Sequence, residues 1–366
     1  MADAVARRTP LYDLHVELGG KVVDFAGWEL PIQYPTGIVA EHKQCREKAA
    51  LFDVSHMGQV MLRGEDVADR FEALVPSAIK TLKPGKARYT VFTNDAGGIR
   101  DDLIAANVGD GLFVVVNGAV RDQDIAYMRA QLDGCEVEEY LDRALVAVQG
   151  PAAVSVVAAL APAAADLSFM ETTEADILGH NCRVSRLGYT GEDGFEISMP
   201  ADQAINICRA LLAHEDCAPA GLGSRDSLRL EAGLCLYGHD IDTETSPIEA
   251  QLGWIIQKRR REEGGFPGAE RILSELTSGP SRKLVGLRPQ GRAPAREGCE
   301  IQTHDGGTIG QVTSGGFAPT LGSPISIGYV AAEHATPGET VNLMVRGKPL
   351  AAEVVTLPFV PHNYKR

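Results

Sequence analysis

The sequence predicts a multidomain protein of mixed α/β (α+β) class that ends in a small β-barrel. The chain has 366 residues, which exceeds a single typical core, so two or three domains are expected. Short strands and helices are mixed through the first 260 residues. After Arg282, short strands separated by Gly and Pro turns follow with almost no helix, a pattern typical of a barrel.

The first region, residues 1–140, holds the clearest hairpin. Residues 89–93 are rich in β-branched and aromatic side chains. Residues 94–98, with the sequence NDAGG, tolerate positive φ and favour a turn. Residues 99–105 then form the return strand.

Asp101 is the most informative residue of this hairpin. Strand side chains alternate between faces, so Asp101 is expected to share a face with Ile99 and Leu103, and Asp102 to point the other way. A carboxylate flanked by two large aliphatic residues is partly desolvated and needs a partner. Catalytic carboxylates are often prepared in this way. The alternative is that Asp101 ends a strand at the surface and caps a turn.

The region from 141 to 260 is expected to alternate strands and helices. The strands are predicted at 144–149, 182–187 and 194–199. The helices are predicted near 152–160, 203–213 and 225–232. The basic run at 258–261, followed by Gly264 and Gly265, is typical of a linker or its edge.

Composition and charge exclude several function classes. The net charge of −14 argues against nucleic-acid binding as the main activity. No apolar run approaches the ~20 residues of a membrane span. The first eight residues lack the apolar segment of a secretory signal, and a short transit peptide is left open.

The cysteines indicate neither a disulfide framework nor a metal site. Their number, seven, is odd, and no pair has CxxC spacing, which is typical of reduced thiols. His180 and Cys182 lie two apart, but no second pair completes four zinc ligands. We therefore expect no metal.

Several polar and aromatic residues stand in positions that suit a binding site. Glu196 lies in a strand with apolar neighbours, and Arg225 is expected to open a helix. Further candidates lie at strand ends or turns, namely Tyr89, Asn117, Tyr189 and Trp254. Taken one at a time, such residues are usually exposed or ion-paired, and that reading stays open at this point.

A series of motifs then connects the chain to a family. They are found at residues 9–13 (TPLYD), 24–34 (DFAGWELPIQY), 51–57 (LFDVSHM), 97–103 (GGIRDDL), 148–151 (VQGP), 188–194 (GYTGEDG), 225–233 (RDSLRLEAG), 236–238 (LYG), 312–319 (VTSGGFAP) and 358–364 (PFVPHNY). With these motifs in order, the chain resembles the T-proteins of the glycine cleavage system, which are tetrahydrofolate-dependent aminomethyltransferases. The resemblance runs almost from end to end.

The resemblance implies a cloverleaf of three domains with a central folate cavity. Two mixed α/β domains are interleaved in sequence, and the third is the β-barrel. The first, folate-binding domain is expected to comprise residues 1–50 and 141–260. Residues 51–140 would form the second domain, which carries the catalytic aspartate, and residues 282–366 the barrel.

The resemblance also implies a reaction and a partner. The lipoylated H-protein carries an aminomethyl group, whose methylene passes to tetrahydrofolate with release of ammonia. The products are 5,10-methylenetetrahydrofolate and dihydrolipoyl H-protein. A cytoplasmic location is implied for a bacterial protein and the mitochondrial matrix for a eukaryotic one. Neither nucleic acid nor membrane is expected as a partner.

The resemblance assigns roles to individual residues. Asp101 matches the family's essential aspartate, which would orient the folate, stabilise a developing positive charge or transfer a proton. Glu196 would accept the paired N–H groups of the pterin edge. The other residues expected to contact folate are Arg225, Asn117, Met57, Tyr89, Tyr189, Trp254, Tyr364 and, at a basic entrance, Arg296.

Two related protein families offer alternative functions. A folate-dependent demethylase would share the fold and the pterin residues but take a small methylated donor. The likeness near residues 234–238 favours the T-protein instead. A non-enzymatic, folate-binding iron–sulfur assembly factor would carry a Lys-Gly-Cys-Tyr-type motif, which this chain lacks, and would lack the aspartate present here as Asp101.

Overall fold

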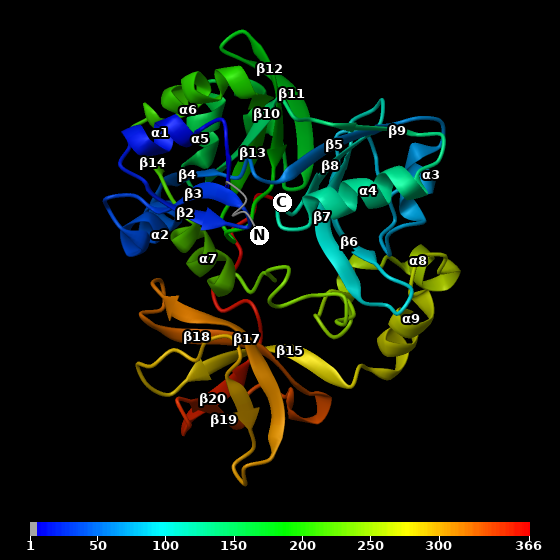
Figure 1. Ribbon diagram of the computed structural model, residues 1–366, viewed down its shortest axis with the longest axis vertical. Coiled ribbons are helices and arrows are strands. Elements are labelled where there is room, and N and C mark those ends of the chain that lie inside the picture. The colour runs from blue at the N-terminus through cyan, green and yellow to red at the C-terminus, as the bar shows by residue number, and fades with distance from the viewer. Residues whose placement is uncertain (1–5) are drawn as a thin grey trace.

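The computed structural model describes residues 6–366 and has three lobes that meet at a common centre (Figure 1). Each lobe is built on its own sheet or barrel, and a further small sheet lies in the first lobe. One apolar cluster spans the lobes, since it joins Val91 of the second lobe, Ile272 in residues 269–278 and Ile327 of the barrel. The predicted α/β multidomain class is confirmed.

The first lobe contains a six-stranded sheet in the order β11-β12-β13-β10-β4-β14. Its strands are β4 (Ala49–Asp53), β10 (Arg143–Gln149), β11 (Glu171–Ile177), β12 (His180–Arg186), β13 (Gly194–Pro200) and β14 (Cys217–Pro219). The small sheet of this lobe has β1 (Arg7–Arg8), β2 (Lys21–Phe25) and β3 (Trp28–Gln33). The helices of the lobe are α1 (Tyr12–Glu17), α2 (Ile38–Glu47), α5 (Ala153–Ala158), α6 (Ala204–Leu212) and α7 (Leu222–Glu231).

The two faces of that sheet have different partners. One face packs on α1, α5 and α6, where Leu14, Val157 and Ile207 meet Val146 and Phe195 in one buried cluster. The other face belongs to a second cluster, shared with the sheet of the second lobe. The two main sheets therefore cover each other across the centre of the molecule.

The second lobe is a five-stranded sheet in the order β6-β7-β8-β5-β9 with helices on its outer face. Its elements are β5 (Gly58–Arg63), α3 (Val67–Glu72), β6 (Ala87–Thr93), β7 (Ile99–Asn107), β8 (Leu112–Val116), α4 (Arg121–Gln131) and β9 (Glu136–Glu139). Phe71 of α3 and Met128 of α4 are buried against Leu103 and Val114 of the sheet. The inner face turns toward the first lobe.

The first two lobes are interleaved in sequence. The chain leaves the first sheet after β4, builds the whole second sheet, and returns at β10. The expected boundary between residues 50 and 51 falls inside β4, so the first sheet extends to Asp53.

The predicted linker at residues 258–261 is wrong, because these residues form helix α8 (Lys258–Glu263). Arg259 donates to both oxygens of Glu72 in α3, at 2.7 and 2.6 Å. The buried Arg260 donates to the carbonyls of Glu72 and Val75. Helix α8 and the next helix, α9 (Ala269–Ser278), thus lie beside the second lobe (Figure 1). The basic run therefore attaches helix α8 to the second lobe.

The third lobe is a closed barrel in the order β15-β18-β17-β16-β19-β20, as predicted. Its strands are β15 (Arg282–Pro289), β16 (Glu300–Gln302), β17 (Thr308–Ala318), β18 (Ser323–Ala331), β19 (Thr340–Val345) and β20 (Lys348–Val355). Short 3-10 helices complete the described elements, at η1 (Pro162–Asp166), η2 (Ala201–Gln203), η3 (Gly253–Ile255) and η4 (Ala332–His334). None of the helices in residues 6–366 is both long and apolar enough to cross a membrane.

The predicted hairpin is confirmed as β6 and β7, with one irregularity. Gly97 has φ +83°, and a side chain on Gly98 would collide with the carbonyl of Thr243, so this turn requires both glycines. A register shift beside Phe92 interrupts the alternation. Ile99 consequently packs with Val91 in the central cluster, and the expectation that it shares a face with Leu103 is wrong.

Candidate functional site

The candidate site lies where the inner faces of the two main sheets meet. A narrow pocket there is lined by both sheets, with Ile104 and Val115 on one side and Leu187 and Glu196 on the other. Asp102 precedes Ile104 by two residues on β7 and so points from the same face. The site therefore draws its residues from segments far apart in sequence.

The two adjacent aspartates of β7 point in opposite directions, as predicted, but the pocket lies on the side of Asp102. Asp101 is fully buried in mid-strand, on the face covered by α4, so the alternative of a surface turn cap is wrong. The Asp102 side chain meets Tyr89 and lies on the inner face. Sequence alternation separated the two residues correctly but did not identify the inward one.

Asn117, which follows β8, connects both carboxylates. Its backbone N–H donates to Oδ2 of Asp101 at 3.0 Å, and its side-chain Nδ2 lies 2.9 Å from Oδ1 of the same residue. The same Nδ2 lies 2.8 Å from Oδ1 of Asp102. The predicted site residue Asn117 thus holds both aspartates in place through its hydrogen bonds.

These carboxyl groups have perturbed pKa values. Burial, together with the charge of Asp101, raises the pKa of Asp102 to about 7, against the hydrogen bonds from Tyr89 and Asn117. Burial and the neighbouring Asp124 raise the pKa of Asp101 well above its ordinary value. A carboxyl group that titrates near neutral pH is suited to proton transfer.

Tyr89 and Trp254 form a wall beside Asp102. The Tyr89 hydroxyl donates to Oδ2 of Asp102 at 3.1 Å. Its ring stacks on the indole of Trp254, with 5.8 Å between ring centroids and an interplanar angle of 19°. Trp254 is 63% exposed, so the pair runs from solvent to a partly buried carboxylate. Stacked rings of this kind suit a flat aromatic ligand.

Glu196, Arg225 and Tyr189 lie together. Burial raises the pKa of Glu196, and the nearby Arg225 guanidinium opposes that shift. The guanidinium lies over the Tyr189 ring, 4.9 Å from its centroid. Nη1 of Arg225 is buried and has no hydrogen-bond partner in the described part of the chain. An unpaired guanidinium N–H is costly unless a ligand satisfies it.

The other predicted residues have varied surroundings. Met57 packs against the cluster between the sheets. Tyr364 lies on the segment that returns from the barrel to the centre (Figure 1), where its ring stacks on Phe169 at 4.1 Å. Arg296 is exposed in the loop between β15 and β16. Its neighbour Glu297 contacts His239 at 2.8 Å.

Sequence reasoning missed three residues near the site. His56 is buried, has an unpartnered Nδ1, and has its pKa lowered by burial to about 4. Arg229 is buried and binds Asp240 and, through Ser314, the barrel. Asp124 lies buried under Asp101. His56 and Arg229 lie in two of the family motifs, which could have marked them as site residues. Asp124 in α4 lies in none of these motifs.

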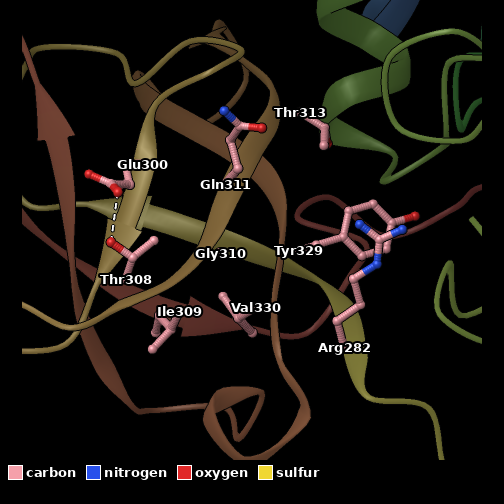
Figure 2. A pocket seen from close by; sticks show the side chains of 9 residues that line it. All are labelled: Arg282, Glu300, Thr308, Ile309, Gly310, Gln311, Thr313, Tyr329 and Val330. Atoms are coloured by element: carbon pink, nitrogen blue, oxygen red, sulfur yellow. Dashed lines mark hydrogen bonds between the residues drawn. The ribbon is translucent and has the colours of Figure 1, made fainter. Parts of the chain in front are cut away.

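A second pocket, of about 370 Å³, lies on the barrel and contains none of the predicted residues (Figure 2). Arg282 and Tyr329 stand at one end of it, and Glu300 and Thr308 at the other. The Arg282 guanidinium lies over the Tyr329 ring and is neutralised by Glu249. Its cation is thus already paired, and the site between the sheets is the stronger candidate.

The described residues contain no group of three or more His, Cys, Asp or Glu side chains placed to hold a metal ion. The absence of a metal site stays a prediction from the spacing of the cysteines and histidines.

Comparison with known proteins is consistent over the whole chain. Residues 11–260 match the family "GCVT N-terminal domain", and residues 282–361 match "Glycine cleavage T-protein C-terminal barrel domain". A mitochondrial aminomethyltransferase of Dictyostelium discoideum is 44% identical, over 98% of this chain and 94% of its own length. A probable mitochondrial aminomethyltransferase of Schizosaccharomyces pombe is 45% identical, over 99% and 95%. The crystal structure of glycine cleavage system aminomethyltransferase T from Bartonella henselae superposes with a TM-score of 0.92, at 40% identity, over 98% of this chain and 99% of that one.

Proposed function

The chain belongs to the glycine cleavage T-protein family and is an aminomethyltransferase, and from this we propose that it transfers a methylene from lipoylated H-protein to tetrahydrofolate with release of ammonia. The observation that carries the proposal is the placement of Glu196, beside Arg225, in a pocket that the second sheet also lines, with Tyr189 close to both Arg225 and Asp102. Tetrahydrofolate, when bound, supplies the nucleophilic nitrogen that accepts the methylene.

Glu196 and Arg225 suit the recognition of a pterin. A carboxylate accepts two parallel N–H donors, which the pterin edge presents side by side. Burial raises the pKa of Glu196, and the Arg225 guanidinium offsets part of that rise. The unpartnered Nη1 of Arg225 leaves one donor for a ligand acceptor. Both features favour a polar, flat heterocycle over an apolar ligand.

We assign the catalytic carboxylate to Asp102, in place of Asp101, on the ground of its direction. Asp102 points from the inner face and receives hydrogen bonds from Tyr89 and Asn117. As a carboxylate it stabilises positive charge that develops on the methylene donor, and near pH 7 it exchanges a proton. Asp101 supports it from the buried side through Asn117.

Trp254, Tyr89 and the exposed Arg296 form the proposed approach to the site. The stacked aromatic pair offers a surface to the ring next to the pterin. The folate tail is a carboxylate, and the H-protein is acidic by resemblance, so a basic group is needed at the entrance of a chain with net charge −14. We place Arg296 in that role.

A coupled assay with lipoylated H-protein and tetrahydrofolate tests the proposal. Ammonia release should require both partners together. Saturating tetrahydrofolate should also raise the thermal midpoint, since a ligand at 100 times its dissociation constant adds about 2.7 kcal/mol. Release of a methylene from a small N-methyl donor without H-protein would favour the demethylase. Folate binding with no turnover on any donor would favour a non-enzymatic binding protein.

A further inference from the structure

We propose that Asp101 and Asp124 form a carboxyl pair that holds one proton between them and so fixes, through Asn117, the orientation of Asp102. Asp124 is then a positioning residue for the reaction, three side chains away from the pocket. This role rests on the proposed function, because it matters only where Asp102 acts.

The geometry connects the pair to the site in one continuous path. Asp101 and Asp124 are 0% and 3% exposed, respectively. Both oxygens of Asp101 face donors of Asn117, at 2.9 and 3.0 Å. The Nδ2 that reaches Asp101 also reaches Oδ1 of Asp102. A change in charge or position at Asp101 therefore moves the amide that holds Asp102.

Two buried carboxyl groups in contact retain a proton. The side chains of Asp101 and Asp124 lie within hydrogen-bonding reach of each other. Like charges that close together do not both ionise in a buried site. Oδ2 of Asp124 is buried and has no partner within residues 6–366, and a shared proton satisfies it. Burial accordingly raises the pKa of Asp124 to about 7 and that of Asp101 further.

The charged surroundings do not remove the need for this proton. Arg100 on β7 faces Asp124, and its guanidinium also lies 4.5 Å from the centroid of the Tyr127 ring. Tyr237, from the loop after α7, faces both carboxyls of the pair, and Asp102 adds a third acid from the same strand. One cation thus stands against three carboxyl groups, and a single retained proton brings the cluster closer to neutrality.

Loss of the proton has a direct consequence for the site. As pH rises above the apparent pKa of the pair, a second negative charge appears next to Asn117. That charge disturbs the Asn117 amide that holds Asp102, and it also raises the pKa of Asp102. We therefore expect the pH profile of kcat/KM to have an alkaline limb that reports the deprotonation of the pair.

The test uses Asp124→Asn, Asp124→Ala and the control Asp122→Asn. An Asn at 124 keeps a donor toward Asp101 that cannot dissociate, whereas Ala removes the partner. Asp122 lies in the same turn of α4 but is exposed, in an ion pair with Arg7. We expect Asp124→Ala to lower kcat/KM roughly tenfold, the effect of about 1.4 kcal/mol of lost interaction. Asp124→Asn should recover most of that loss and should lack the alkaline limb.

A second measurement needs no substrate. Because the folded pKa values of the pair are raised, the native state binds more protons than the unfolded state between about pH 4 and pH 7. Stability toward urea should therefore fall as pH rises through this range in the wild type. Asp124→Asn should flatten that slope, and Asp122→Asn should leave it unchanged.

The outcomes separate this inference from the proposed function. An unchanged stability slope in Asp124→Asn, with normal wild-type turnover, would overturn the shared proton. Equal loss of turnover in Asp124→Asn and Asp124→Ala, with wild-type pH profiles, would overturn the positioning role. Failure of the proposed function has a different signature, since wild-type protein would then show no turnover with H-protein and tetrahydrofolate whatever residue stands at 124.

Discussion

The hydroxyl of Tyr89 donates a hydrogen bond of 3.1 Å to Oδ2 of Asp102. Its ring meanwhile stacks on Trp254, which is largely exposed. A ligand that displaces or covers the indole therefore acts on the residue that supports the carboxylate. We therefore expect ligand entry past Trp254 to affect the protonation of Asp102 through the Tyr89 hydroxyl.

The first prediction compares the two aspartates of β7. Asp102→Asn should reduce turnover by roughly 10²–10³, because an amide cannot hold the negative charge at the reacting methylene. Asp101→Asn should reduce turnover less and lower the free energy of unfolding more. Both oxygens of Asp101 accept hydrogen bonds from Asn117, and the NH2 group of an asparagine would place a donor against one of these donors. Steady-state assays with H-protein and urea unfolding give both values. If Asp101→Asn proved the more damaging to turnover at equal folate affinity, the catalytic role would return to Asp101.

The second prediction concerns pH. The raised pKa of Asp102, about 7, means that its charged form grows as pH rises through neutrality, so kcat/KM should increase over that range. The Tyr89 hydrogen bond favours the charged form, so Tyr89→Phe should shift this acid limb to higher pH. Tyr127→Phe serves as the control, because Tyr127 lies on α4, on the other side of the sheet. The same shift in both variants would show that Tyr89 does not act through Asp102.

The third prediction addresses the pterin anchor. Glu196→Gln should weaken tetrahydrofolate binding about tenfold to a hundredfold, because hydrogen bonds to a charged group contribute about 1.5–3 kcal/mol each. Glu174→Gln, an exposed change on β11 of the same sheet, two strands from β13, is the matched control. Isothermal titration with tetrahydrofolate measures both. Affinity within a factor of two of wild type for Glu196→Gln would remove Glu196 from the pterin site.

The fourth prediction concerns the H-protein. Arg296→Glu should slow association and change its salt dependence, because it reverses a charge at the proposed entrance. Arg346→Glu makes the same charge change in the turn between β19 and β20. Stopped-flow binding of lipoylated H-protein at several ionic strengths compares the two. Equal association rates for the two variants would exclude a special role of Arg296.

Local patterns predicted the hairpin, the barrel and most strands, because alternation and turn residues act over a few positions. Helix α7 begins at Leu222, so Arg225 lies within it and does not open it. The predicted linker at residues 258–261 is wrong for a related reason. Only the contact of Arg259 with Glu72 distinguishes a packed helix from a solvated segment. Residues paired across the chain give no local signal.

The site illustrates the same limit. Alternation placed Asp101 and Asp102 on opposite faces, but which face meets the first lobe is decided by how the two sheets pack. Asp124 offered no pattern at all, because its significance arises from one buried contact with Asp101. Glu196 and Arg225 stay predicted site residues, and only the family resemblance singled them out in the sequence.

The segment that follows the barrel has a consequence for how the protein is made. Asn363 binds Glu192 and the carbonyl of Gly191, and Phe169 donates its N–H to the carbonyl of Lys365. Phe169, Gly191 and Glu192 all precede the first barrel strand, which begins at Arg282, by 90 residues or more. The first lobe therefore emerges from the ribosome well before its last contacts exist. The hydrogen bonds of Gly191, Glu192 and Phe169 with the C-terminal segment form only after the barrel has been synthesised.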